Sequence, residues 1–364
     1  MPHIKFTLGI ESSCDETAAA VYGGNPPVFV EKVARQFDIH SPYGGVVPEL
    51  ASRCHLEAVS LLATETCKEA DISLDDISLI AATAGPGLAG ALVVGLTYGK
   101  SLAFALEKPF VAVNHVEAHM YAACAESEIE FPFIALVVSG GHTLLVDVKN
   151  ELEYTILGRT RDDAAGEAFD KGAKILGLPY PGGVSIEKTG KNGNVSAYDF
   201  PRALKERKSL DFSFSGLKTS LLYFNEKNPN APIEDVCASY QQAIVDVLVR
   251  KSIFAAQGLN RKTIVLGGGV VANKKLREDI NSAAEKKGIR VVLPSFNLCT
   301  DNARMIAYRG KILYEKRGSD NFKTDIFPMF TGNGSTTNNP PSADLRRITV
   351  KTHGRASLRL TNNE

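Results

Sequence analysis

The sequence lacks an excess of either charge and lacks any long uninterrupted hydrophobic run. Its 41 basic residues balance 41 acidic ones, so no global positive field indicates a nucleic-acid partner, and an RNA contact would need a local basic patch. The longest apolar stretch, ALVVGLTYGKSLAFAL from Ala91, contains Lys100 and two glycines. It is too short and too interrupted to span a bilayer, so we expect no membrane segment.

Cysteine is scarce, and no two cysteines form a C-x-x-C pair. The chain also shows no charged and then apolar leader before its first strand pattern. We therefore expect free thiols, a reducing environment and a cytoplasmic location. The six cysteines are Cys14, Cys54, Cys67, Cys124, Cys237 and Cys299.

The sequence contains the same arrangement of elements twice. A hairpin is predicted at IKFTLGIESSCDETAAAVY from Ile4 and again at FIALVVSGGHTLLVDV from Phe133. Each hairpin is followed by a strand, a glycine turn, a helix and a strand, starting at Ile77 and at Lys262. Strands that enter helices through glycine turns indicate right-handed parallel crossovers. With 364 residues, 44% of them hydrophobic, the chain is predicted to form a duplicated α/β fold of two lobes.

The repeat also predicts the limits of the lobes. The first lobe is expected over residues 1–125 and the second over 126–300, with an insertion at about 150–215. A helix with apolar residues at helical spacing lies within 301–330 and is expected to complete the first lobe. Residues 331–364 begin with a polar stretch rich in Pro, Gly and Asn and are predicted to be a flexible tail.

Two histidines lie four positions apart in NHVEAHMYAA, residues 114–123. In a helix over 115–125, His115 and His119 would be about 40° apart around the axis and could reach one metal ion. Glu117 would lie about 200° from His115, whereas the glutamate of the peptidase motif H-E-x-x-H directly follows the first histidine. A zinc peptidase is therefore disfavoured. The alternative is that both histidines are polar residues at a helix start, satisfied by hydrogen bonds.

Asp301, in LCTDNARM, is a candidate third ligand because it lies between a strand and a helix of the other half. Two imidazoles and one carboxylate would leave open positions on Fe(II), Zn(II) or a similar ion. An aspartate directly before a helical pattern is also a good N-cap. The residues alone allow either role.

Three glycine turns suggest a nucleotide between the lobes. VSGGHT (138–143) offers Ser139 and His142 beside two glycines, although a plain hairpin turn explains it equally well. LGGGVVAN (266–273) follows a strand and opens a helix, which favours contact with phosphate or an adenylate. GPGLAG (85–90) is the equivalent turn of the first lobe and is explained by a tight turn alone.

The start of the predicted insertion is acidic and is followed by a glycine pair next to a proline. Asp170 and Glu187 could hold ribose hydroxyls there. Spacing alone favours the alternative, which is an acidic helix face.

Ten segments in the same order resemble the bacterial form of the tRNA N6-threonylcarbamoyladenosine transferase family, once described as a sialoglycoprotein endopeptidase. The resemblance runs from about residue 6 to residue 317. The ten segments are IESSCDET (10–17), YGGVVPELASRCH (43–55), GPGLAGALVVG (85–95), NHVEAHMYA (114–122), VSGGHT (138–143), DDAAGEAFDK (162–171), YPGG (180–183), FSFSGLKT (212–219), GGGVVAN (267–273) and CTDNARMIA (299–307).

The resemblance implies a fold and an activity. The fold would be the two-lobe architecture of actin, hexokinase and the Hsp70 ATPase. The reaction would transfer a threonylcarbamoyl group from threonylcarbamoyl-AMP to N6 of adenosine 37 in tRNAs that read codons beginning with A, with release of AMP. The RNA would supply the nucleophile, and no side-chain nucleophile is implied.

The resemblance also implies site residues. His115, His119 and Asp301 would hold one divalent metal ion per subunit, with Fe(2+) expected and Zn(2+) or Mg(2+) as alternatives. The residues implied to bind the adenylate are Val138, Ser139, Gly140, Gly141, His142, Asp170, Gly183, Glu187 and Asn273.

The implied partners are tRNA, an inactive paralogous subunit of the same fold and a small P-loop ATPase. The basic stretch 202–218 is a candidate surface for the tRNA. Two other functions stay open from the residues. One is an ATP-dependent kinase or ATPase of the same fold, which the glycine turns permit, and the other is a non-catalytic scaffold.

Overall fold

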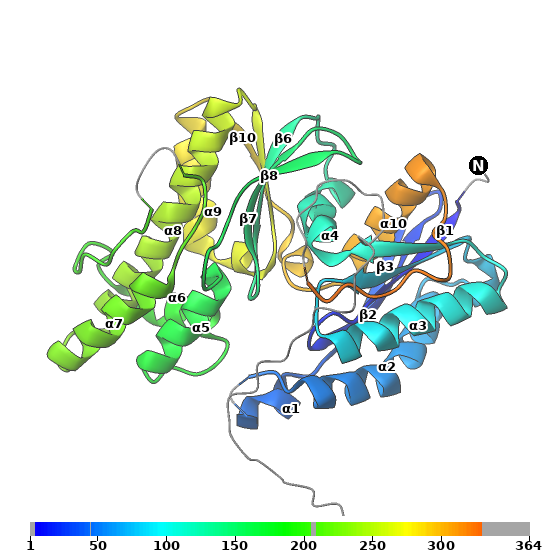
Figure 1. Cartoon of the computed structure of the whole chain (residues 1–364), viewed down its shortest axis with the longest axis horizontal. Coiled ribbons are helices and arrows are strands. Elements are labelled where there is room, and N and C mark those ends of the chain that lie inside the picture. The colour runs from blue at the N-terminus through cyan, green and yellow to red at the C-terminus, as the bar shows by residue number, and fades with distance from the viewer. Residues whose placement is uncertain (1–3, 44, 205–208, 330–364) are drawn as a thin grey trace, which may run out of the picture.

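A computed structural model describes residues 4–43, 45–204 and 209–329 (Figure 1). The described chain forms two lobes, each built on a five-stranded mixed sheet. The first sheet has the order β3-β2-β1-β4-β5 and the second the order β10-β9-β6-β7-β8. The predicted duplicated α/β fold of two lobes is therefore confirmed. The predicted tail, residues 331–364, lies outside the described residues.

The strands of the first sheet are β1 (Phe6–Glu11), β2 (Glu16–Gly23), β3 (Val28–Arg35), β4 (Leu79–Gly85) and β5 (Phe110–Asn114). Those of the second are β6 (Phe133–Val138), β7 (Thr143–Val148), β8 (Tyr154–Arg159), β9 (Thr263–Gly267) and β10 (Arg290–Val292). In both sheets the first two strands form an antiparallel hairpin, and the next strand of the predicted repeat pairs in parallel with the first. Both predicted hairpins are present.

The third strand of each sheet was not predicted from the sequence. β3 pairs with β2, and β8 pairs with β7, in the same antiparallel way. Both are edge strands of mixed burial, and β3 carries Glu31 and Lys32 in its interior. A strand of this kind shows neither a buried apolar run nor a clean alternation. β8 lies inside the predicted insertion at 150–215, so the extra length of the second lobe follows this strand.

Helices cover both faces of the first sheet. α2 (Pro48–Glu69) and α3 (Ala89–Ala105) lie on one face, while α4 (His115–Tyr121) and α10 (Ala303–Arg317) lie on the other (Figure 1). α10 returns from the end of the chain to pack on β1, β2 and β4. A Cβ atom at Gly9 would lie 2.5 Å from the carbonyl oxygen of Ala303, so glycine in β1 permits the close approach of α10.

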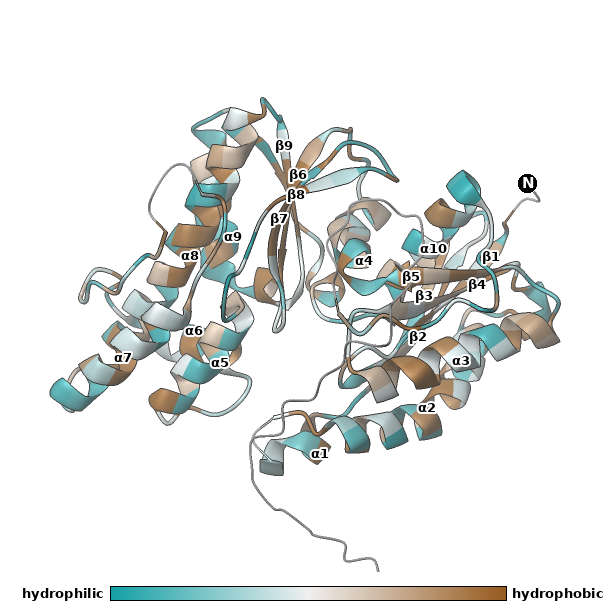
Figure 2. Ribbon diagram, in the orientation of Figure 1, coloured by the Kyte–Doolittle hydropathy of each residue, from teal (hydrophilic) through white to brown (hydrophobic). Residues whose placement is uncertain are grey.

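The remaining helices belong mainly to the second lobe, and α8 is the longest of the described helices. Brown, hydrophobic stretches lie along β6 and β7 and along parts of α8 (Figure 2). Among the described residues, none of the helices has both the length and the apolar character needed to cross a membrane. These remaining helices are α1 (Phe37–His40), α5 (Ala165–Ile175), α6 (Gly182–Thr189), α7 (Ser215–Lys227), α8 (Ile233–Gly258) and α9 (Lys274–Glu285).

Candidate functional site

The two histidines share one face of α4, between the lobes. The helix begins directly after β5, and the Asn114 side chain caps it by accepting from the backbone N–H groups of Val116 and Glu117. The rings of His115 and His119 are 4.7 Å apart between centroids, and both side chains are buried. The predicted helix is α only to Tyr121, and 3-10 geometry follows from Ala122 to Ala125.

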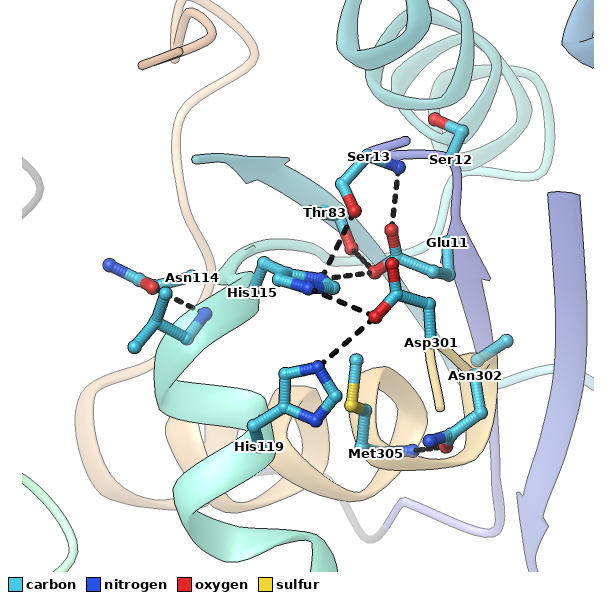
Figure 3. Close-up of polar contacts among 12 residues, drawn as sticks. Glu11, Ser12, Ser13, Thr83, Asn114, His115, His119, Asp301, Asn302 and Met305 are labelled. Atoms are coloured by element: carbon cyan, nitrogen blue, oxygen red, sulfur yellow. Dashed lines mark hydrogen bonds and ion pairs between the residues drawn. The ribbon is translucent and has the colours of Figure 1, made fainter. Parts of the chain in front are cut away.

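Asp301 approaches both rings from the other end of the chain. Its Oδ1 atom lies 3.3 Å from Nε2 of His115 and 3.2 Å from Nε2 of His119 (Figure 3). The cap of α10 is Asn302, whose side chain accepts from the N–H group of Met305 at 2.8 Å. The alternative role for Asp301, an N-cap, is therefore filled by its neighbour. The Asp301 carboxylate is left to face the histidines.

Glu11 is part of this cluster, although its sequence context did not predict a role for it. Its carboxylate is fully buried at the end of β1 and lies 3.0 Å from Nδ1 of His115 (Figure 3). It also accepts from the Ser13 N–H group and the Thr83 hydroxyl, each at 2.6 Å. With Glu11 on Nδ1, the Nε2 atom of His115 faces Asp301. The segment ESSCDET signalled a hairpin, and only the fold placed Glu11 beside a histidine.

The three side chains have the spacing of ligands on a common ion. One ligand atom from each of His115, His119 and Asp301 can be chosen so that all lie within 4.8 Å of one another. Two ligands that are each about 2.0–2.2 Å from a metal ion are separated by roughly 3 Å or slightly more, and the contacts to Asp301 have this length. Glu11 occupies the outer position that a carboxylate takes behind a metal-bound imidazole. The cluster therefore fits a divalent metal ion.

The charges in the cluster favour a cation. Burial opposes charge on both carboxylates, yet the nearby His115 holds the pKa of Glu11 and of Asp301 below their ordinary values. Burial likewise opposes charge on His115, but Glu11 and Asp301 raise its pKa well above the ordinary value. Burial lowers the pKa of His119. Two carboxylates thus face one charged histidine, which leaves a net negative charge that a divalent ion would neutralise.

A cleft of about 1070 Å³ opens between the lobes beside this cluster. His115 and Asp301 line it from the first lobe, together with residues of the β1–β2 turn and of the turn after β4. Val138 does not line it, because its side chain is buried at the end of β6. The residues predicted to bind the adenylate that do line the cleft are Ser139, Gly140, Gly141, His142, Asp170, Gly183, Glu187 and Asn273.

Several glycines on the cleft wall have no local structural requirement. An added Cβ atom at Gly140, Gly141 or Gly269 would meet nothing within 4 Å, and none of the three has a positive φ. By contrast, a Cβ atom at Gly166 would lie 2.6 Å from the carbonyl oxygen of Ser139. Close packing therefore explains why position 166 is glycine, but neither packing nor backbone conformation explains Gly140, Gly141 and Gly269. Close approach of a ligand to the backbone would explain these three glycines.

The three consecutive glycines at the end of β9, Gly267 to Gly269, serve three different purposes. A Cβ atom at Gly267 would lie 2.1 Å from the carbonyl oxygen of His119, so this glycine lets α4 approach the strand. Gly268 has φ of +96°, which disfavours any other residue. Only Gly269 lines the cleft. The sequence motif thus combines one position that faces a ligand with two that build the wall.

The polar candidates on the second-lobe wall also hold local structure. Asp170 accepts from the Gly182 N–H group at 2.8 Å, and Glu187 accepts from the Lys274 N–H group at 3.1 Å. Asn273 caps α9 through the Leu276 N–H group. Asp170 and Glu187 therefore brace the cleft wall, and the alternative of a solvated acidic helix face does not describe them.

Two reactive residue types in the cleft are held neutral. Burial, reinforced by nearby His115 and His119, lowers the pKa of His142 to about 4. Burial and the negative charges of Asp15 and Asp301 raise the pKa of the Cys14 thiol far above its ordinary range. A thiol in that state is a poor nucleophile at neutral pH.

Comparison with known proteins gives a consistent picture. The family model described as tRNA N6-adenosine threonylcarbamoyltransferase matches residues 27–308. A protein of that name from Geotalea uraniireducens (strain Rf4) is 49% identical over 327 residues, which are 89% of this chain and 95% of the relative. Another, from Kosmotoga olearia, is 50% identical over 310 residues, which are 85% of this chain and 92% of the relative.

Solved structures resemble the chain in fold at low identity. Full-length HypF in its phosphate- and nucleotide-bound form superposes with a TM-score of 0.60 at 12% identity, covering 87% of this chain and 56% of HypF. HypF of T. kodakarensis superposes with a TM-score of 0.61 at 13% identity, covering 86% of this chain and 48% of that HypF chain. These likenesses establish the two-lobe architecture alone.

Proposed function

Because this chain belongs to the tRNA N6-adenosine threonylcarbamoyltransferase family, we propose that its cleft carries out that transfer from threonylcarbamoyl-AMP. The acceptor is N6 of adenosine 37 in tRNAs that read codons beginning with A, and AMP is released. The chain is a transferase that acts in tRNA modification. One observation carries the substrate proposal: His115 and Asp301, two members of the candidate metal cluster, line the same cleft as the unexplained glycines of the other lobe.

The reaction forms a bond between adenine N6 and the carbamoyl carbon, breaks the bond from that carbon to the AMP phosphate oxygen, and releases one N6 proton to the solvent. Negative charge develops on the carbonyl oxygen and on the leaving phosphate. Backbone N–H groups around Gly140, Gly141 and Gly269 lie on the cleft wall without side chains in front of them, so they can donate to the phosphate. A divalent ion, when bound, would polarise the carbonyl oxygen as a Lewis acid.

We propose Fe(2+) as the resident ion, held by His115, His119 and Asp301. Two imidazole nitrogens and one carboxylate oxygen suit Fe(2+) or Zn(2+). Mg(2+) prefers an all-oxygen set, which makes it the weakest of the three candidates. Glu11 keeps a proton on Nδ1 of His115, so that Nε2 is the ligand atom.

The acceptor is tRNA, and we propose that the chain works with a paralogous subunit of the same fold and with a small P-loop ATPase, as its sequence resemblance implies. The docking surface proposed from the sequence, 202–218, is only partly described, because Lys205 and Lys208 lie outside the described residues. Arg202 pairs with Asp199 and with Asp246. Its charge is therefore already partly neutralised, which weakens this end of the stretch as an RNA surface.

The proposal is tested by incubating the purified chain and its partner proteins with threonylcarbamoyl-AMP and unmodified tRNA. Digested RNA is then analysed by mass spectrometry. We expect modified adenosine from the native chain and none from Asp301→Ala. Absence of product from the native chain would refute the proposed reaction. Hydrolysis of ATP with phosphorylation of a small hydroxyl compound would instead support the kinase alternative.

A further inference from the structure

Two exposed aromatic rings meet across the mouth of the cleft. Phe37 lies at the start of α1 in the first lobe, and Tyr180 lies just before α6 in the second lobe. Their ring centroids are 6.0 Å apart and their planes differ by only 7°. Both rings line the same cleft as His115 and Asp301. The pair is therefore a contact between the lobes at the entrance to the proposed site.

Core packing does not explain these rings. Phe37 is 40% exposed and Tyr180 is 42% exposed, and neither belongs to any hydrophobic cluster of the described residues. Two large apolar faces left open at a cleft entrance are typical of a ligand-binding wall. Parallel rings on two separate bodies can accept a flat group between them when the bodies move apart.

The charges around the pair select the kind of flat group. Burial and the negative charges of Asp170 and Asp15 raise the pKa of the Tyr180 hydroxyl to about 12, so the ring is neutral. Asp15 and Asp170 line the same cleft, whereas the nearby Glu16 is already paired with Arg35 at 3.0 Å. Carboxylates repel a phosphate group, whereas they accept hydrogen bonds from an exocyclic amine. The surroundings therefore favour a nucleobase over the RNA backbone.

We propose that Phe37 and Tyr180 form an aromatic clamp that stacks the adenine base of the tRNA as it enters the cleft. A base taken out of a loop loses its stacking neighbours, and aromatic side chains commonly replace them. The clamp rests on the proposed function, since it presents the base whose N6 atom is modified. It acts on the acceptor RNA and has no part in holding the adenylate.

The test uses the absence of tryptophan from the sequence. Phe37→Trp creates a single tryptophan whose fluorescence is quenched by a stacked base. The variant is titrated with an anticodon stem-loop that carries adenosine at position 37 and with a matched stem-loop that is abasic there. We expect strong quenching by the first RNA and little by the second. Phe104→Trp is the control, because Phe104 is 74% exposed on α3 and does not line the cleft; it should respond to neither RNA.

Kinetics give an independent readout. Phe37→Ala and Tyr180→Ala should raise KM for tRNA roughly 10- to 100-fold, the effect typical of removing one base-stacking ring. KM for threonylcarbamoyl-AMP should stay unchanged, and Tyr180→Phe should recover most of the tRNA KM that Tyr180→Ala loses, because the ring is retained.

Two results would overturn the clamp while leaving the proposed reaction intact. One is equal quenching by the abasic and the complete stem-loop. The other is an equal rise in KM for both substrates, which would indicate a latch that only closes the lobes. If the native chain forms no modified adenosine at all, the proposed reaction fails first, and the two failures are thereby distinguished.

Discussion

The guanidinium of Arg309 donates to the carboxylate of Glu117 over 2.9 Å, and the exposed side-chain fractions are only 0% and 7%. Glu117 also accepts from the Tyr154 hydroxyl at 3.0 Å, and Arg309 donates to the carbonyl oxygen of Glu151 at 2.7 Å. The Arg309 guanidinium lies 4.1 Å above the ring of Tyr121. The glutamate between the two histidines is thus the centre of a buried polar network where the lobes meet.

This network explains why Glu117 cannot act as the base of a peptidase. The Glu117 side chain faces away from His115 and His119, as the helical spacing predicted. Its ion pair with Arg309 connects α4 to α10. α10 begins two residues after Asp301. The ion pair therefore joins the helix that carries the histidines to the helix that follows the aspartate.

Breaking the ion pair should destabilise the fold strongly. Arg309→Met leaves the Glu117 carboxylate buried without its charged partner, which costs about 3–5 kcal/mol in the free energy of unfolding. The exposed pair of Arg53 with Glu49 is the matched control, and Arg53→Ala should cost less than about 1 kcal/mol. Urea unfolding of both variants measures the difference. Equal costs would contradict a structural role for the buried pair.

Neighbouring substitutions should separate the metal ligand from the helix cap. Asp301→Ala removes a proposed ligand and should abolish stoichiometric metal binding, measured by mass spectrometry of the reconstituted protein. Asn302→Ala removes the cap of α10 and should lower the free energy of unfolding by about 1 kcal/mol, with metal content retained. A variant at Asp301 that still binds one ion per chain would exclude this residue as a required ligand.

Glu11→Gln should weaken metal binding although Glu11 is not a ligand. The neutral amide orients His115 less firmly and no longer increases its basicity, and loss of such an outer partner typically lowers metal affinity about 10- to 100-fold. Competition with a chelator measures the change. Ser12→Ala is a control in the same turn, because the Ser12 hydroxyl donates to the carbonyl of Ala91 instead. Similar affinities for the two variants would remove Glu11 from the site.

His142 should make the fold less stable as the solution becomes acidic. Burial lowers its folded pKa to about 4, below the value of about 6.5 expected in an unfolded chain. The unfolded state then binds more protons, so the stability from neutral His142 is complete above pH 6.5 and is lost as pH falls toward 4. His142→Asn should flatten this part of the pH profile of urea midpoints. An NMR titration of His142 near pH 6.5 would refute the prediction.

Cys14→Ser should modify tRNA at close to the native rate. The raised pKa of the thiol keeps Cys14 protonated at neutral pH, so the variant loses no nucleophile. The assay is formation of modified adenosine under saturating substrates, with metal content measured in parallel. Loss of activity with normal metal content would reveal a direct chemical role.

Patterns within short stretches of sequence account for most of the features that were predicted correctly. Alternating apolar residues identified both hairpins, and helical spacing placed His115 and His119 on one face with Glu117 turned away. β3 and β8 were missed because edge strands with charged residues lack such signals. Glu11 was missed because its importance comes from His115, a residue 104 positions away.

The sequence by itself determined the helix that carries the two histidines and the phase of its side chains, because these depend on periodicity within a few residues. Only the tertiary structure decided between two roles for Asp301. Asn302 is the N-cap of α10. The packing of α10 on the first sheet brings Asp301 next to His119, which is 182 positions away in the sequence. Such a contact depends on how helices and sheets pack, and no local pattern specifies it.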